Sequence, residues 1–308
     1  TLDAIEEIRG LTDKQCYLSG MSAVITDIKK ICNSEAVMYV VIAAGLSALV
    51  LALTMDSFLI PVFFLLSIGM AIIYNLGTNF VAGEMSFITQ ALAAVLQLAV
   101  TMDYSIFLWH SYQENQGRFP GDKKRAMAHA ISNTISSVVG SSITTVAGFV
   151  AMCFMTFTLG MDLGIVMAKG VVLGVVGCVT ILPSMILVFD KAIEKTKHRA
   201  IIPDLGRIGN FVTKKYPLFL VLFFLILVPA LYGYTHTDVY YDLAGTLPKD
   251  LESVEANNKL EENFDMGATH IILADSRLEP KDASAMIDEI EAVDGIAAVL
   301  SKDAFLGL

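Results

Sequence analysis

The sequence has 308 residues, of which 55% are hydrophobic, with a mean hydropathy of +0.63 and a formal net charge of −10. This apolar content exceeds what a soluble domain needs for its core, so we predict a polytopic α-helical membrane protein. Phosphate binding needs clustered Lys and Arg, and the acidic balance therefore excludes nucleic acid as a partner. Four scattered cysteines are too few for a disulfide framework or a metal site, and we expect no cofactor.

Residues 1–35 are predicted to be soluble and to end a first extracytoplasmic domain. Apolar residues at three-residue spacing indicate a short amphipathic helix from Leu2, which Gly10 is expected to end. A short strand over residues 16–20 and a helix over residues 21–31 should then lead into the membrane. The sequence does not begin with Met and shows no secretory signal, which we interpret as an internal piece of a longer protein.

Six apolar stretches follow, and each has close to the ~20 residues that cross ~30 Å of hydrocarbon. They cover residues 36–54, 58–78, 87–109, 135–157, 163–189 and 217–234. The first five make up a membrane region, residues 36–189, and a linker over residues 190–216 precedes the sixth. Ser57 is expected to cap the second helix after a tight turn.

The orientation of the spans follows from Lys and Arg in the short loops. The loop over residues 111–134 holds four basic residues and the linker over residues 190–216 holds seven. The loops over residues 79–86 and 158–162 hold none. The basic loops are therefore predicted to be cytoplasmic. Residues 1–35 and 235–308 are then extracytoplasmic in a multi-pass protein of the cell membrane.

Two further patterns concern helix surfaces. Met127, Ile131 and Ile135, four residues apart, predict an amphipathic segment on the inner leaflet. We interpret two sets of small residues as faces for close helix packing in lipid, in preference to a proton path. These are the stripe Ser137, Ser141, Thr144 and Gly148, and the pair Gly170 and Gly174.

The acidic C-terminal part, residues 235–308, carries sixteen acidic and five basic residues. Residues 269–274 are predicted to be a strand, residues 281–293 a helix and residues 296–300 a second strand. This order predicts a βαβ unit in an α+β, ferredoxin-like domain, the truncated start of a second extracytoplasmic domain. A soluble piece before each membrane segment indicates an internally repeated protein.

The span over residues 87–109 contains Asp103 at hydrocarbon depth. An Asp at mid-helix costs about 2.5–3.5 kcal/mol to insert, and such residues usually face a bundle interior or a water-filled cavity. Desolvation favours the neutral form of a carboxyl, so Asp103 is our candidate for a group that takes up and releases a proton. The alternative is a neutral Asp103 that hydrogen-bonds a neighbouring helix and only holds the bundle together.

Lys169 is the other charged residue within a span, about two turns from the predicted outer end. Its stem is expected to extend outward, toward Asp162. At 1.5 Å per residue, Lys169 and Asp103 differ in depth by on the order of 15 Å, so we expect no direct pair. Lys169 and Thr101 are kept as candidate accessory residues.

The segment Thr101–Leu108, TMDYSIFL, resembles the G-x-D-Y-x-x-F-L signature on the fourth membrane helix of the resistance–nodulation–division (RND) superfamily, in its MMPL-like branch. Residues 130–152 and 182–184 are similar to parts of that family's fifth and sixth helices. Residues 240–242 resemble the start of its second extracytoplasmic domain. Met102 departs from the pattern, since a glycine is frequent at that position.

The resemblance implies twelve membrane helices in two pseudo-repeats, of which this chain would hold helices two to seven. It implies export of lipids or other hydrophobic molecules, driven by the proton-motive force. Asp103 and Tyr104 carry over as the first repeat's half of a proton relay, in which each Asp pairs with the Tyr of the other repeat. The implied partners are the membrane, protons, a lipid substrate and the remaining half of the transporter, and a homo-oligomer is compatible with this picture.

Two alternative functions are weighed against this reading. A sterol-sensing-type regulatory module uses a similar five-helix segment to bind lipid without transport, but an intramembrane Asp favours a pump. An intramembrane aspartyl protease needs a second catalytic Asp and a Gly-x-Gly-Asp setting, which the residues before Asp103 lack, so we expect no enzyme. The sequence leaves protons and sodium open as the coupling ion, and the resemblance implies protons.

Overall fold

The computed structural model describes residues 2–11, 16–81, 83, 85–198, 206–237, 247–264, 266, 271–275, 277–293, 295–296 and 299. The described part is helical, and six of its helices are long and apolar enough to cross a membrane. They are α2 (Met21–Thr54), α3 (Leu59–Gly77), α4 (Phe87–Arg118), α5 (Lys123–Met152), α6 (Thr158–Val188) and α9 (Tyr216–Thr235). The prediction of a polytopic helical membrane protein is thereby confirmed.

The remaining elements are short. They are α1 (Leu2–Leu11), the 3₁₀ helix η1 (Thr78–Val81), α7 (Asp190–Lys195), α8 (Gly206–Lys214), α10 (Glu252–Phe264) and α11 (Pro280–Glu291). Helix α11 matches the helix expected there, and α1 continues through Gly10, which does not end it. Helices α7, α8 and α10 were not predicted from the sequence.

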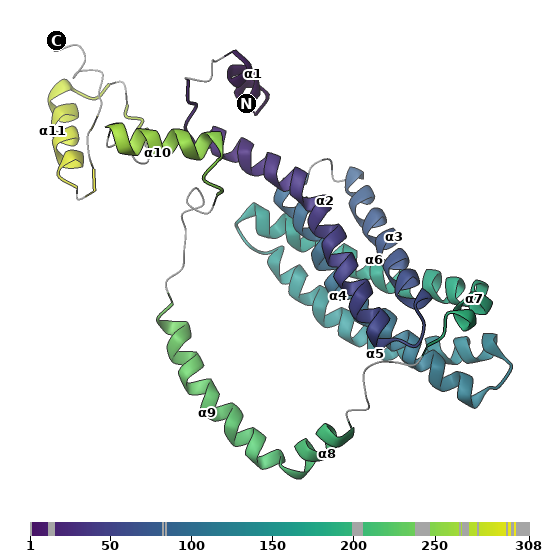
Figure 1. Ribbon diagram of the computed structural model, residues 1–308. Helices are drawn as coiled ribbons and strands as arrows, with labels where there is room; N and C mark the ends of the chain where they lie inside the picture. The colour runs from purple at the N-terminus through teal and green to yellow at the C-terminus, as the bar shows by residue number, and fades with distance from the viewer. Residues whose placement is uncertain are drawn as a thin grey trace. The chain divides into compact units, whose positions relative to one another are not determined.

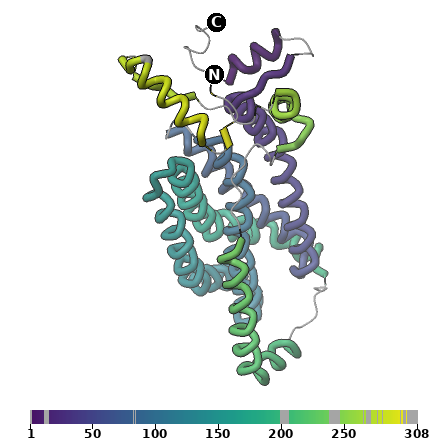
Figure 2. Tube along the Cα trace, turned by 90° about the vertical axis from the view of Figure 1, so that its left-hand side faces the viewer, coloured from purple at the N-terminus to yellow at the C-terminus, as the bar shows by residue number. Residues whose placement is uncertain are grey.

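Helices α3, α4, α5 and α6 lie side by side as a bundle (Figure 1), and the view turned by 90° shows the same arrangement (Figure 2). We call the end at which α3 ends and α4 and α6 begin the η1 end, and the opposite end the α7 end. The largest fully buried apolar side chains of the bundle include Phe64, Leu108, Met127, Leu182 and Ile186.

Close helix contacts in the bundle depend on glycines of α6. A Cβ atom built on Gly174 would lie 2.4 Å from Cγ2 of Thr101, and one on Gly170 would lie 2.6 Å from Nδ2 of Asn75. Gly170 and Gly174 therefore let α6 approach α4 and α3 closely, as the sequence predicted. The stripe on α5 differs, because all four of its predicted packing residues are exposed in the described structure.

The segment from Met127, which was predicted to lie on the inner leaflet, packs into the bundle instead, so this prediction was wrong. Helix α5 begins at Lys123, and its first turns pack into the bundle core, with Ala126, Met127 and Ala130 at most 1% exposed. Of the three residues on which the prediction rested, Met127 faces the core, Ile131 is half-buried and Ile135 is 40% exposed. The first turns of α5 pack because α4 and α5 both extend beyond the apolar stretches and continue to contact each other. Only residues 119–122 connect these two helices.

Residues 31–238 form one compact unit, and residues 1–30 and 239–308 together form another. In the second unit, the Arg9 guanidinium donates to both carboxylate oxygens of Asp27, at 2.7 and 3.0 Å. The same carboxylate accepts the backbone N–H of Ser253 at 3.2 Å. Segments that were predicted to belong to two soluble domains thus contact each other, and Lys259 also donates to the Tyr17 hydroxyl at 2.7 Å.

The α+β character expected of the soluble segments is not found in the described residues. Residues 16–20 and 271–274 form no strand there, and residues 267–270 lie outside the described structure. A strand needs a hydrogen-bonding neighbour, and the exposed side chains of Ile271 and Leu273 show that these residues pack against none of the described elements. Most of the second expected strand, residues 296–300, also lies outside the described part.

Candidate functional site

Helix α4 has one face that no described helix covers. We call it the bare face of α4. Its exposed residues recur every three or four positions, as one side of an α-helix requires. They are Leu92, Leu96, Ala99, Asp103, Phe107 and His110. Asp103 lies near the middle of this 32-residue helix, with apolar side chains before and after it.

The opposite face of α4 packs into the bundle. Thr101 is 1% exposed, and its hydroxyl donates to the Gln97 carbonyl oxygen at 2.7 Å. Two residues along a helix correspond to a rotation of about 200°, so Thr101 and Asp103 lie on different sides of α4. The structure therefore does not bring Thr101 into contact with the candidate carboxyl.

Tyr104 also belongs to the bundle interior. It is 3% exposed and lies in the same buried cluster as Leu108 and Val138. Neighbouring helical residues differ by about 100° in direction, and this rotation separates the buried phenol from the exposed carboxyl of Asp103. Of the adjacent residues Asp103 and Tyr104, the first therefore lies on the bare face and the second in the core.

Asp103 makes no hydrogen bond or ion pair with any described residue. In this part of the chain it therefore does not link α4 to a neighbouring helix. An intramembrane carboxyl normally faces a bundle interior or a water-filled cavity. The bare face thus presents a titratable group at a position where another helix or water can meet it. Among the described residues, no three His, Cys, Asp or Glu side chains gather into a group that could hold a metal ion.

Lys169 extends toward the η1 end of the bundle, as predicted, but not toward the expected acid. Its ammonium donates to Oδ1 of Asn79 in η1. Asp162 instead accepts the backbone N–H of Ser86 at 2.9 Å, which fixes the start of α4. No ion pair joins Lys169 to Asp103 or to any other acid in the described structure, consistent with the expected difference in depth.

An amide pair inside the bundle was missed by the sequence analysis. Asn75 and Gln97 are both fully buried, and Nδ2 of Asn75 donates to Oε1 of Gln97 at 2.8 Å. Nε2 of Gln97 donates in turn to the Gly170 carbonyl oxygen at 3.1 Å. The pair links α3, α4 and α6 on the side of α4 opposite Asp103. The four-residue spacing of Gln97 and Thr101 was the available signal.

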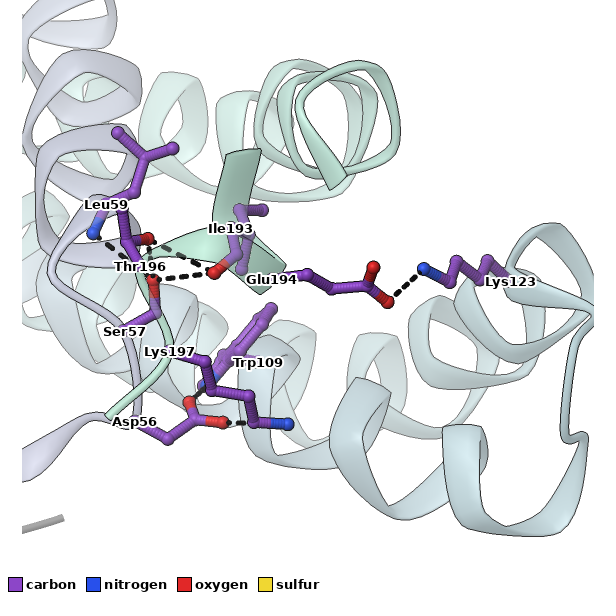
Figure 3. A network of polar contacts seen from close by, with 9 residues as sticks. All are labelled: Asp56, Ser57, Leu59, Trp109, Lys123, Ile193, Glu194, Thr196 and Lys197. Atoms are coloured by element: carbon purple, nitrogen blue, oxygen red, sulfur yellow. Dashed lines mark hydrogen bonds and ion pairs between the residues drawn. The ribbon is translucent and has the colours of Figure 1, made fainter. Parts of the chain in front are cut away.

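A second polar cluster lies at the α7 end, where the turn between α2 and α3 meets α7 (Figure 3). The Asp56 carboxylate accepts the indole N–H of Trp109 at 3.2 Å and lies 3.5 Å from the Lys197 ammonium. The N-cap position of α3 is Phe58 and not Ser57 as expected, although the Ser57 hydroxyl accepts the backbone N–H of Leu59 at 3.3 Å.

Helix α7 is also tied to α5 in this cluster. The Lys123 ammonium, at the start of α5, forms ion pairs with Asp190 and Glu194 of α7, the latter at 2.6 Å. This hydrogen bond holds the pKa of the Glu194 carboxyl below its usual range. The contacts thus join the turn between α2 and α3, the indole of Trp109 in α4, the start of α5 and α7 at this end of the bundle.

Six apolar helices and a carboxyl at mid-helix on a bare face define a multi-pass membrane protein with a candidate ion-coupling group. The MMPL family model matches residues 2–215, and the chain belongs to the MMPL family. It is 25% identical over 268 residues to membrane protein YdfJ of Bacillus subtilis, an alignment that covers 83% of this chain and 36% of YdfJ. It is 26% identical over 242 residues to the siderophore exporter MmpL5 of Mycobacterium tuberculosis, covering 73% of this chain and 24% of MmpL5. The chain thus spans roughly a quarter to a third of the length of these relatives.

Proposed function

We propose that this chain is part of a secondary transporter that exports lipids or other hydrophobic molecules, and that Asp103 carries the coupling proton. The observation that carries the proposal is the exposed carboxyl at the middle of α4, on the bare face of a membrane helix. Membership of the MMPL family and the similarity to an exporter support transport as the activity.

The rest of the same transporter is the proposed partner of the bare face. The side chains beside Asp103 on this face are apolar, with Leu96 37% and Phe107 55% exposed, as a surface that packs against another membrane helix requires. A helix there would exclude lipid from Asp103 and supply a hydrogen-bonding group. Protonation would then change the charge inside that interface, and movement of the two halves would follow.

The proposal includes an orientation. The basic residues of the loop over residues 111–134 and of the linker before α9 support a cytoplasmic position for the α7 end of the bundle. The η1 end and the unit formed by residues 1–30 and 239–308 are then extracytoplasmic. In this orientation, protons that enter the cell pass Asp103 near the midplane of the membrane.

The test is substrate efflux from vesicles that contain the full-length protein, under an imposed pH gradient. Asp103→Asn keeps the shape of the side chain and removes its titration, so the protein should insert and bind substrate without gradient-driven efflux. Asp103→Glu retains the titration with one more methylene and should keep partial activity. Tyr104→Phe removes only a hydroxyl and should reduce efflux less than Asp103→Asn.

His110→Gln is the matched control, because His110 is the next titratable side chain along the bare face. We expect this variant to keep the efflux rate of the parent. Efflux by Asp103→Asn at the rate of the parent would end the proton-carrier proposal. Efflux driven by a sodium gradient alone, with no response to the pH gradient, would replace protons by sodium as the coupling ion.

A further inference from the structure

The amide pair of Asn75 and Gln97 can form in only one direction. A backbone carbonyl only accepts hydrogen bonds, so the Gly170 carbonyl oxygen requires the amide nitrogen of Gln97 to face it. This turns Oε1 of Gln97 toward α3, where Asn75 must present its own nitrogen. Exchange of nitrogen and oxygen in either side chain would set two acceptors against each other. The pair is therefore a directed link from α3 through α4 to α6.

The space for this link exists because α6 carries no side chain at position 170. A Cβ atom built on Gly170 would lie 2.6 Å from Nδ2 of Asn75 and 2.8 Å from Oε1 of Gln97. One turn further along α4, Thr101 fits against Gly174 in the same way. The side of α4 that carries Gln97 and Thr101 is thus matched to glycines of α6 at two successive turns.

Apolar packing alone distinguishes the two sides of α4 poorly. The bare face carries Leu92 and Leu96, and the buried face carries Leu98 and Leu108. Lipid tails are as apolar as these side chains, so no hydrophobic driving force selects which side of the helix turns inward. A buried amide is different, because it costs free energy when it loses its partner. The directed link therefore selects the rotation of α4 about its axis.

The rotation set by Gln97 decides how the adjacent residues Asp103 and Tyr104 are directed. At 100° per residue, Tyr104 lies about 20° from Gln97 around the helix, and Asp103 lies about 120° from it. With Gln97 turned inward, Tyr104 is buried and Asp103 lies on the bare face. The hydrogen bonds of Trp109 to Asp56 and of Ser111 to α5 lie near the α7 end. Among the described side chains of α4 on the η1 side of Asp103, Gln97 is the one that hydrogen-bonds neighbouring helices.

We propose that Gln97 and Asn75 are positioning residues, which hold α4 in the rotation that turns Asp103 toward the rest of the transporter. Their contribution is direction, because replacing both partners of a buried hydrogen bond by apolar groups of similar shape can leave stability nearly unchanged. The consequence for transport rests on the proposed function of Asp103, whereas the rotation itself does not.

The test measures the rotation of α4 in full-length protein in lipid vesicles, with the native cysteines replaced. Spin labels at Leu92→Cys, on the bare face, and at Val176→Cys, exposed on α6, give a distance by pulsed electron paramagnetic resonance. A rotation of α4 by one residue step displaces a side chain about 5–6 Å from the helix axis by about 8–9 Å. A second pair of labels, at Val150→Cys in α5 and Val176→Cys, does not include α4 and should keep its distance.

In the double variant Asn75→Leu/Gln97→Met, we expect the distance between positions 92 and 176 to change by as much as about 8–9 Å. The distance between positions 150 and 176 and the midpoint of unfolding in a denaturing detergent should stay at the values of the parent. Gln90→Met is the matched control, because Gln90 is an exposed glutamine of the same helix, and it should keep the parental distance. The double variant should lose gradient-driven efflux although it remains folded.

An unchanged distance in the double variant would overturn the proposal, because other contacts would then fix the rotation. An equal change in Gln90→Met would also overturn it. If Leu and Met do not pack, Asn75→Val/Gln97→Leu repeats the test, and loss of the fold in both variants would show that the amides are needed for folding and not for direction.

The efflux measurement separates this inference from the proposed function. Parental efflux by a double variant whose distance has changed would show that the rotation does not position Asp103. Efflux by Asp103→Asn at the rate of the parent would end the proposed function, and the distances would still decide what fixes the rotation of α4.

Discussion

The contact between Gly174 and Thr101 makes a quantitative prediction about the bundle. A Cβ atom at position 174 would lie 2.4 Å from Cγ2 and 3.0 Å from Cβ of Thr101. Thr101 cannot easily turn away, because a β-branched side chain is restricted in a helix and its hydroxyl is bonded to the Gln97 carbonyl. Gly174→Ala should therefore push α4 and α6 apart.

The expected cost follows from the size of this overlap. Overpacking by one carbon in a well-packed interior lowers the free energy of unfolding by about 1–3 kcal/mol. Better helix propensity of Ala recovers at most about 1 kcal/mol, so we expect a net loss of about 1–2 kcal/mol. Gly69→Ala in α3 is the matched control, because nothing lies within 4 Å of a Cβ built there. It should be neutral or slightly stabilising.

A second substitution tests the mechanism. Thr101→Ser removes Cγ2 but keeps the hydroxyl, at a cost of about 0.8 kcal/mol for the lost methyl group. The double variant should then be more stable than the sum of the two changes predicts, by about 1 kcal/mol or more. The assay is the loss of helical circular dichroism of full-length protein during titration with a denaturing detergent. If the effects of Gly174→Ala and Thr101→Ser on the free energy of unfolding add to within about 0.5 kcal/mol, this account of the contact is refuted.

Two other predictions concern topology and charge. A cysteine label replacing the exposed Lys124 should be reached only from the cytoplasm and one replacing Glu279 only from outside, and labelling of position 279 from the cytoplasm would reverse the proposed orientation. Lys169→Met should leave insertion and much of the efflux intact, because the ammonium bonds Asn79 at the η1 end and not the candidate carboxyl. Loss of efflux equal to that of Asp103→Asn, with normal insertion, would instead place Lys169 in the relay.

The membrane spans were predictable because transfer from water to lipid depends on composition over about 20 residues. The same hydropathy argument placed the end of the loop over residues 111–134 at Thr134, where α5, which begins at Lys123, is already well into the bundle. The residues from Lys123 include charged and polar side chains, so the segment has no apolar signature of its own. Its helical packing depends on Met127 and Ala130 meeting α4, which only the tertiary structure shows.

The sequence predicted that Asp103 lies within a membrane span, but it did not predict which face of α4 is exposed. Asp103 is identified by charge at hydrocarbon depth, and this needs only the sequence. The side of α4 that is bare depends on which faces α3, α5 and α6 cover, and the motif does not encode those contacts. Tyr104 is buried for this reason, although its neighbour is exposed. The pairing of Asn75 with Gln97 was not predictable, because the spacing of Gln97 and Thr101 marks a polar side of α4 but does not show that Asn75 of α3 meets it.

The carboxylate of Asp27 has a further consequence for biosynthesis. Its partner Arg9 lies 18 residues away in sequence, whereas its partner Ser253 lies 226 residues away. At a synthesis rate of about 5–20 residues per second, the second partner emerges roughly 10–45 s after the first contact can form. During that interval all six membrane helices are made. Residues 1–30 can therefore form the ion pair between Arg9 and Asp27 early, but they gain the contact with Ser253 only after α9 has been made and α10 has begun.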